Sequence, residues 1–147
     1  MEYDEYLRLM IFIPGKIDKC INLISNEYLK GSPIKFYTIP YLYQIHTFDG
    51  ISQKKLKELI PFDKSRISIV VRELIDAGLV VDTGTKRNSS LHLTEQGENT
   101  LPLCKLFIEL IKKEIFGEDN IFSPEYIKKT FEFDERLDML IDKYSKK

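Results

Sequence analysis

The chain has 147 residues, of which 43% are hydrophobic and 31% are charged, and its net charge is −1. This composition is ordinary for a soluble globular protein of one or two small domains, and it argues against a disordered chain. The longest apolar run, 9–14, is too short to cross a membrane, and the acidic segment 1–5 is unlike the positive start of a secretory signal, so we expect a cytoplasmic protein with no membrane partner.

The first predicted element is a helical stretch over residues 3–30. It is expected to break at Pro14-Gly15, because proline suits the first turn of a new helix better than the middle of one. The segment 30–33, Lys-Gly-Ser-Pro, ends it. In the second part, helical spacing predicts one buried face, formed by Ile17, Cys20 or Ile21, Ile24 and Tyr28.

A short aromatic helix follows and is expected to end near Thr47. Pro40 lies inside this stretch, so the helix either starts late, with Thr38 as its cap, or kinks. A turn over 48–50 leads to Ile51, which we expect to pair as a one-residue strand fragment.

Two further helices are predicted from their capping residues. Ser52 is expected to cap a helix over 53–59 that buries Leu56 and Leu59. After Pro61, Asp63 is expected to cap a helix over 64–77, which Gly78 ends in the left-handed conformation.

The rest of the chain reads as a hairpin and two long helices. Strands over 79–81 and 90–93 flank a polar turn over 82–88. A helix then runs from Thr94 to about Phe116, with Pro102 as a kink, and a loop over 117–120 follows. Ser123-Pro124-Glu125 opens the last helix, which is expected to end near Tyr144. Two helices joined by a tight turn and followed by a hairpin indicate a winged helix-turn-helix.

The helix over 64–77 has two distinct faces. On a helical wheel Ile67, Val70, Val71 and Leu74 form the buried stripe, whereas Ser65, Ile69, Arg72 and Asp76 point the opposite way, with Ser68 at the flank. Small hydroxyl groups allow close approach to base edges, and an arginine reaches guanine or phosphate. Ile69 is read either as a contact to a thymine methyl group or as a stray surface apolar residue.

The charge of the chain is concentrated around this helix. Residues 50–90 carry a net charge of +3, whereas residues 1–49 carry −1 and residues 91–147 carry −3. Lys64 and Arg66 are placed for phosphate contacts, and the hairpin tip carries Lys86 and Arg87, which reach the minor groove unless the tip is simply a solvated turn. The predicted DNA contacts are Ser52, Gln53, Lys54, Lys64, Ser65, Arg66, Ser68, Ile69, Arg72, Lys86 and Arg87.

At these positions the sequence resembles the MarR family, the multiple-antibiotic-resistance regulators. The resemblance runs over 50–97, and its strongest part is Gly78-Leu79-Val80, a wing, and then Leu91-His92-Leu93-Thr94-Glu95-Gln96-Gly97. It implies an obligate homodimer whose first and last two helices interlock, and whose winged lobes meet a pseudo-palindromic operator. It places Ser65, Arg66, Ser68 and Ile69 at recognition-helix contacts, Arg87 at the wing arginine, and Ser52 and Gln53 at the start of the supporting helix.

Two residues depart from the family pattern. The family often has arginine where this chain has Ile69, so methyl recognition replaces a guanine contact. The family usually has an aspartate just before the basic pair of the wing, where this chain has Thr85, so the acid that commonly fixes Arg87 is missing.

The apolar content of the last two helices favours dimerisation independently. The helix after Thr94 is apolar on most sides, and Phe133, Leu137, Leu140, Ile141 and Tyr144 form one stripe of the last helix; packing of these two helices on each other accounts for part of this surface.

We expect a mainly α protein with a small β-hairpin wing. Residues 34–99 form the winged helix-turn-helix DNA-binding lobe, and residues 1–33 and 100–147 form the helical dimerisation region.

Ligand, redox and metal functions have weaker signals. The resemblance implies release of DNA by a small aromatic effector, and Tyr37, Tyr41 and His46 are candidate pocket residues, or else ordinary core and surface aromatics. Cys20 is either a redox-sensing thiol or a buried one. No cofactor and no metal site is expected from two histidines and two cysteines.

Three classes of function come into question for such a chain. The first is a DNA-binding regulator, with a repressor role expected. The second is a protein-interaction module that kept the winged fold but lost DNA binding, which the modest positive charge and Thr85 leave open. The third, an enzyme, is disfavoured because the sequence has no nucleophile–base pair, paired carboxylates or phosphate-binding glycine loop.

Overall fold

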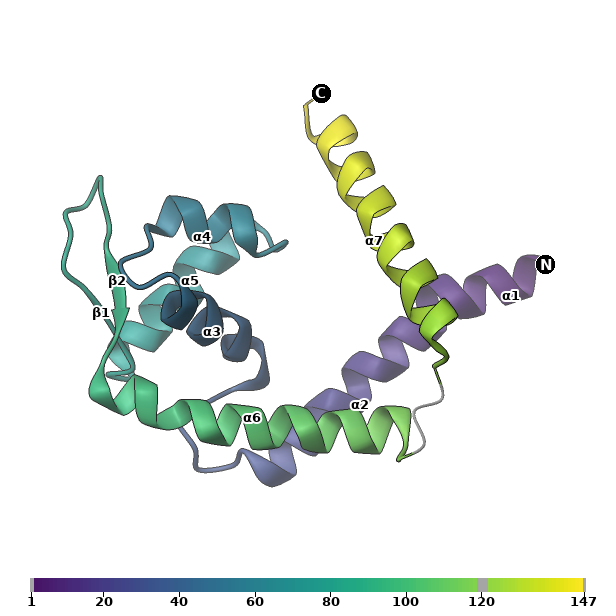
Figure 1. Cartoon of the computed structure of the whole chain (residues 1–147), viewed down its shortest axis with the longest axis horizontal. Coiled ribbons are helices and arrows are strands. Elements are labelled where there is room, and N and C mark those ends of the chain that lie inside the picture. Colours follow the sequence, from purple (N-terminus) through teal and green to yellow (C-terminus); the bar gives the residue numbers. More distant parts are fainter. Residues whose placement is uncertain (1, 119–121, 147) are drawn as a thin grey trace. The chain divides into compact units, whose positions relative to one another are not determined.

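A computed structural model describes residues 2–118 and 122–146 of the chain. The chain divides into two compact units, Met1–Leu110 and Ile111–Lys147. The first unit holds the winged helix-turn-helix, and its helices and hairpin follow the order predicted from the sequence (Figure 1). No helix in the described part of the chain is long and apolar enough to span a membrane.

The N-terminal helices follow one another without interruption. They are α1 (Tyr3–Leu7), a π-helical turn (Arg8–Phe12) and α2 (Ile13–Tyr28). Pro14 lies in the first turn of α2, as predicted, but the predicted break is wrong and the wider π-helical turn stands in its place. Pro14 has no N–H to donate and its ring meets the carbonyl group four residues earlier in a regular α-helix, so a wider turn before it relieves that contact.

The predicted burial along α2 is not found in the single chain. Cys20 and Tyr28 are exposed, Ile17 is 39% exposed, and Ile21 and Ile24 are only half-buried. Helical spacing identified an apolar face, but the surface that covers such a face does not have to come from the same chain.

The helices of the winged lobe begin where local chemistry predicts. A 3-10 turn (Phe36–Thr38) precedes α3 (Ile39–Thr47), so that helix starts late, with Pro40 in its first turn. The Thr38 hydroxyl group bonds to the backbone of Lys35 and does not cap α3 as predicted. α4 (Gln53–Leu59) begins at Ser52, whose Oγ accepts a hydrogen bond from the Lys55 N–H at 3.0 Å. α5 (Lys64–Asp76) begins after Asp63, but the predicted cap is wrong in detail, because the Asp63 carboxylate accepts from Ser65 Oγ and makes no capping hydrogen bond to the backbone. Gly78 follows α5 with a φ of 76°.

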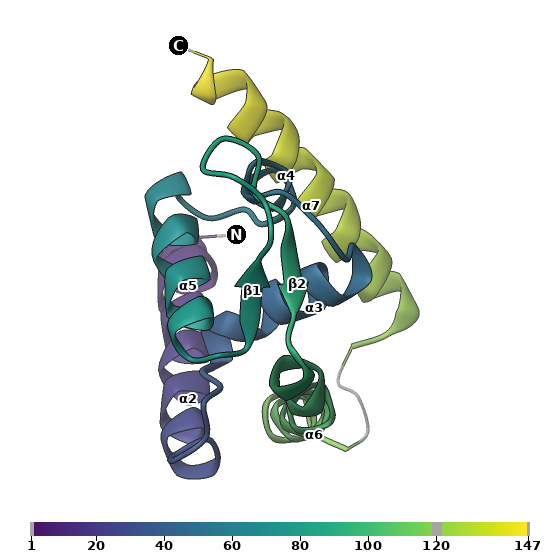
Figure 2. The same ribbon diagram turned by 90° about the vertical axis from the view of Figure 1, so that its left-hand side faces the viewer.

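The wing is a two-stranded antiparallel hairpin formed by β1 (Val80–Asp82) and β2 (Leu91–Leu93). Val80 pairs with Leu93, and Ile51 forms an isolated bridge to Leu91, as predicted. β1 contacts α5 and β2 contacts α3, so the hairpin lies against both helices at its base (Figure 2).

The core of the lobe is formed by side chains that meet from α3, α4, α5 and the hairpin. Its most deeply buried members are Ile34, Tyr41, Leu42, Ile45, Leu56, Ile67, Leu74, Leu79 and Leu91. Leu59, which was expected to be buried with Leu56, is only half-buried. This core fixes which face of α5 is turned inward and therefore which face is turned outward.

Two long helices complete the chain. α6 (Glu95–Phe116) continues through Pro102, and Thr94 Oγ1 caps it by accepting from the Gly97 N–H at 3.0 Å. α7 (Pro124–Ser145) is capped by Ser123, as predicted, and none of its residues is buried. Part of the predicted loop over 117–120, residues 119 and 120, lies outside the described residues.

Candidate nucleic-acid interface

The outward face of α5 is exposed as the helical wheel predicted. Ile67, Val70, Val71 and Leu74 are all at most 3% exposed, whereas Ser65, Arg72 and Asp76 are exposed. The side chain of Ile69 is 61% exposed, which is a large apolar exposure for a residue beside the buried stripe. This face therefore offers a hydroxyl group, an aliphatic group and a guanidinium group to any surface that approaches it.

The first turn of α5 makes intramolecular contacts that the sequence did not indicate. Ser65 Oγ donates to the Asp63 carboxylate at 3.0 Å. The Arg66 guanidinium lies over the ring of Phe62, 5.2 Å from its centroid, and 5.9 Å from the ring centroid of Tyr37. Lys64 and Arg66 are both exposed, but two aromatic rings contact the Arg66 guanidinium, whereas Lys64 has no such contact among the described residues.

Gln53 and Ser68, both predicted DNA contacts, bond to each other. Gln53 Nε2 donates to Ser68 Oγ at 2.7 Å, which joins the start of α4 to α5. The Gln53 backbone N–H donates to Ser89 Oγ, also at 2.7 Å, which joins α4 to the wing. Sequence reasoning did not identify Ser89, because a hydrogen bond between residues 36 positions apart leaves no local pattern.

The wing is ordered by short polar contacts rather than by an ion pair. Asp82 Oδ1 accepts from the N–H groups of Gly84 and Ser90, each at 2.9 Å. Thr85 Oγ1 accepts from the Asn88 N–H at 3.1 Å, so the threonine that stands in place of an acid helps to close the tip. Near this tip the hairpin bears its two cations.

The predicted cations are available to a polyanion. Lys54, Lys64, Arg72, Lys86 and Arg87 are exposed, and none of them forms an ion pair with a carboxylate of residues 2–118 or 122–146. Ser52, by contrast, uses its hydroxyl group to cap α4.

His92 fastens the base of the wing to the body of the lobe, a role that the sequence did not indicate. Its Nδ1 lies 2.8 Å from Asp49 Oδ1, and its Nε2 lies 3.0 Å from Thr83 Oγ1 and 3.1 Å from Ser90 Oγ. Both ring nitrogens are thus engaged, and the hairpin is attached to the turn before α4.

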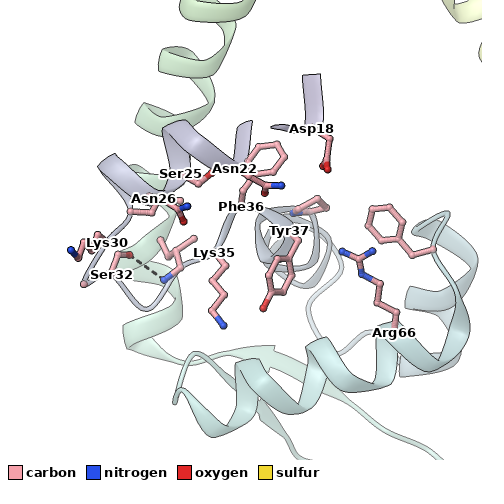
Figure 3. A pocket seen from close by; sticks show the side chains of 15 residues that line it. Asp18, Asn22, Ser25, Asn26, Lys30, Ser32, Lys35, Phe36, Tyr37 and Arg66 are labelled. Carbon is pink, nitrogen blue, oxygen red and sulfur yellow. Dashed lines mark hydrogen bonds between the residues drawn. The ribbon is translucent and has the colours of Figure 1, made fainter. Parts of the chain in front are cut away.

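A cavity of about 940 Å³ lies beside the N-terminal end of α5 (Figure 3). Tyr37 lines it between Lys35 and Arg66, and its hydroxyl group donates to Glu73 Oε2 at 2.7 Å. Burial raises the pKa of the Tyr37 phenol, and the hydrogen bond to Glu73 adds to this, so the group stays a neutral donor. A hydrogen bond with Tyr37 raises the pKa of Lys35, which keeps a cation at the wall.

The structure does not bring the three predicted pocket residues together. Of Tyr37, Tyr41 and His46, only Tyr37 lines this cavity. Tyr41 is fully buried, and its hydroxyl group has no partner among the described residues. His46 Nδ1 lies 3.1 Å from a Glu98 carboxylate oxygen, at a half-exposed position.

The two thiol groups differ in exposure. Cys20 is exposed on α2, which meets one condition for a reactive thiol, and redox sensing by it stays a prediction. Cys104 is buried in α6, and burial raises the pKa of its thiol. Within the described residues, no three His, Cys, Asp or Glu side chains gather as metal ligands.

The curated proteins that resemble this chain are described as HTH-type transcriptional regulators. No family model matches the chain. An uncharacterized HTH-type transcriptional regulator of Bacillus cereus is 31% identical over 80 residues, which are 54% of this chain and 54% of that protein. The HTH-type regulator YybA of Bacillus subtilis is 29% identical over 94 residues, 62% of this chain and 63% of its own. The chain thus spans between half and two thirds of the length of these curated relatives.

Solved structures match over most of the chain. A MarR family regulator from Listeria monocytogenes in complex with a 26mer DNA has a TM-score of 0.71 at 23% identity, covering 90% of this chain and 88% of that one. The regulator SlyA has a TM-score of 0.71 at 20% identity over 91% and 94% of the chains, and a MarR variant from E. coli in complex with operator DNA has 0.68 at 16% identity over 89% and 96%. The chain has the winged-helix fold of these regulators, as the motif at 78–97 predicted.

Proposed function

We propose that the chain is a transcriptional regulator that binds duplex DNA in a sequence-specific manner as a homodimer and acts as a repressor. The observation that carries this proposal is the outward face of α5. Ile69 and Arg72 lie exposed on a helix whose opposite face is fully buried, and the neighbouring wing bears Lys86 and Arg87 without ion pairs to described carboxylates. Two of the structures with this fold contain DNA, which supports the same reading.

The division of labour follows from the chemistry of the exposed groups. The cations of α5 and the wing neutralise phosphate charges and release counterions, which supplies affinity without sequence information. Ile69 and Arg72 face the base edges in the major groove, where an aliphatic side chain recognises a thymine methyl group and a guanidinium recognises guanine. Ser65 donates its hydroxyl hydrogen to Asp63, and its small side chain allows the helix to approach the bases closely.

Dimerisation is proposed through residues 1–33 and 100–147, with residues 34–99 as the DNA-binding lobe. Neither α2 nor α7 buries any residue in the single chain, although both carry large apolar side chains. Large apolar side chains that are more than half exposed include Met10, Ile11 and Phe12 in the π-helical turn, Leu23 in α2, and Phe131, Phe133, Met139 and Ile141 in α7. Apolar surface of this extent marks an interface, and two-fold symmetry gives half-sites about one helical turn apart.

Release by an effector is the last part of the proposal. The cavity beside α5 combines the aromatic faces of Phe36, Tyr37 and Phe62 with the cations Lys35 and Arg66. Such a wall suits a small aromatic compound that bears a negative charge. A ligand that competes for Arg66 alters the start of α5 and so shifts the populations of DNA-binding and non-binding forms.

The experiment is selection of duplexes from a random library, followed by titration of the best sequence at several salt concentrations. The logarithm of the affinity is expected to fall linearly with the logarithm of the salt concentration, with a slope that becomes shallower by about one per half-site in Arg87→Ala. Lys143→Ala, a lysine in the last turn of α7, is the matched control and leaves the slope unchanged. Absence of salt-dependent binding to any duplex overturns the proposal and favours a protein-interaction module.

A further inference from the structure

We infer that Gln53 is a positioning residue, which sets the wing relative to the recognition helix, and that Ser68 acts with it instead of reading a base. This inference rests on the proposed DNA binding. It separates Gln53 and Ser68 from the residues that touch DNA, although both were predicted to contact DNA.

The first half of the link joins α4 to the wing. Gln53 is the first residue of α4, so its backbone N–H has no acceptor within that helix and needs one elsewhere. It donates to Ser89 Oγ at 2.7 Å, on the arm that returns from the wing tip. Next to it the Leu91 N–H donates to the Ile51 carbonyl group at 2.9 Å, so this arm is held at two successive points.

The second half joins α4 to α5. Gln53 Nε2 donates to Ser68 Oγ at 2.7 Å, and Ser68 Oγ in turn donates to the Lys64 carbonyl group at 3.3 Å. A serine hydroxyl group has a single hydrogen to donate. With that hydrogen directed to the helix backbone and one lone pair taken by Gln53, Ser68 has no donor for the acceptors of a guanine or thymine.

One residue therefore contacts both DNA-reading elements of the lobe. The backbone of Gln53 holds the wing, and its side chain holds α5, while both Gln53 and Ser68 are half-buried. The wing cations and Ile69 must reach the duplex at the same time for the dimer to bind well. A fixed spacing between them lowers the ordering cost of that simultaneous contact.

A double-mutant cycle on DNA affinity tests this inference. Gln53→Met keeps the length of the side chain but removes the amide donor, and Ser68→Ala removes the acceptor. Each is expected to weaken binding to the selected duplex by about three- to tenfold, as for loss of one hydrogen bond. If the two side chains act as one link, the double variant is no weaker than the more affected single variant.

Base preference provides the second readout. Gln53→Met and Ser68→Ala are expected to keep the preference of the unsubstituted protein across the selected duplexes. Ile69→Ala, on the same helix, is the matched control, because it is expected to change the preference and to add to the effect of Gln53→Met. Independent effects of Gln53→Met and Ser68→Ala, or a changed base preference in Ser68→Ala, overturn the inference.

A readout without DNA tests the link itself. The side-chain amide resonances of Gln53 in a ¹⁵N–¹H NMR spectrum are expected to shift in Ser68→Ala, and the Gln53 backbone N–H is expected to exchange faster with solvent in Ser89→Ala. Unchanged resonances and exchange contradict the link. Failure of the unsubstituted protein to bind any duplex refutes the proposed function, whereas intact binding with an additive cycle refutes only this inference.

Discussion

At the scale of single residues, Ile69 leads to the most specific prediction about the DNA sequence that the protein recognises. A β-branched aliphatic side chain that is 61% exposed between hydroxyl and guanidinium groups has no packing role in the single chain. The thymine-methyl hypothesis predicts that deoxyuridine in place of the contacted thymine weakens binding about three- to fourfold per half-site, because one buried methyl group contributes about 0.8 kcal/mol.

The same substitution in DNA gives the control for Ile69→Ala. That variant is expected to bind the thymine and deoxyuridine duplexes equally, because the side chain that senses the methyl group is gone. Arg87→Ala is expected to weaken both duplexes alike while keeping the discrimination between them. An Ile69→Ala protein that still prefers thymine contradicts the hypothesis, and the affinities are measured by fluorescence anisotropy.

The residue scale also shows where sequence reasoning ends. The spacing of Ile67, Val70 and Leu74 was enough to predict the outward face of α5, since burial of a helix stripe follows a fixed period. Which partner an exposed polar side chain chooses has no such period. The contacts of Arg66 with aromatic rings and of Gln53 with Ser68 therefore could not be predicted from the sequence, and the DNA contacts predicted for Arg66 and Gln53 stay predictions.

At the scale of elements, the junction between the wing and α6 depends on Gly97. A Cβ atom at this position collides with the Leu79 carbonyl oxygen and lies close to the Leu93 side chain. The first turn of α6 therefore packs directly on the backbone that leads into β1 and on the last residue of β2. A side chain here has to push these backbones apart.

Gly97→Ala is expected to lower the free energy of unfolding by about 1–3 kcal/mol, the usual cost of overpacking. Gly15→Ala is the matched control: this glycine lies in α2 with nothing within 4 Å of an added Cβ. It is expected to raise the free energy of unfolding by about 0.5–1 kcal/mol, because alanine favours a helix. Urea denaturation measures both, and equal effects of the two substitutions contradict the packing argument.

Element boundaries were predictable where a side chain caps a helix within a few residues. The hydroxyl oxygens of Ser52, Thr94 and Ser123 each accept a hydrogen bond from the backbone N–H three residues later. Such a local interaction can be predicted from the residue type and its position. The π-helical turn before Pro14 was not predictable, because the sequence shows only that proline disturbs the helix there. A break and a wider turn are both solutions to that disturbance.

At the scale of the whole molecule, apolar side chains that were predicted to be buried but are exposed in the single chain fit the proposed homodimer. Ile17 and Tyr28 were expected to be buried by their spacing, and they are 39% and 58% exposed. In α7, the predicted stripe that includes Phe133 and Leu137 is likewise exposed. Periodicity predicts which face of a helix is apolar, but it carries no information about which molecule covers that face.

Leu137→Lys tests this interpretation, because it puts a charge in the middle of the α7 stripe. If the stripe packs on a second copy, burial of an unpaired ammonium group is costly, and the variant is expected to sediment as a monomer in analytical ultracentrifugation. A monomer engages one half-site at a time, so its affinity for the two-site operator is expected to fall by about a hundredfold or more.

Glu135→Lys is the control, since it introduces a lysine on the opposite face of α7, where the ammonium group stays exposed to water. It is expected to remain a dimer and to bind the operator as the unsubstituted protein does. Far-UV circular dichroism of both variants distinguishes lost assembly from lost folding, because the winged lobe has its own buried core and keeps its helices in the monomer. A Leu137→Lys protein that stays dimeric with full operator affinity contradicts an interface on α7, and the same substitution then tests the exposed apolar residues Leu23 of α2 and Leu106 of α6.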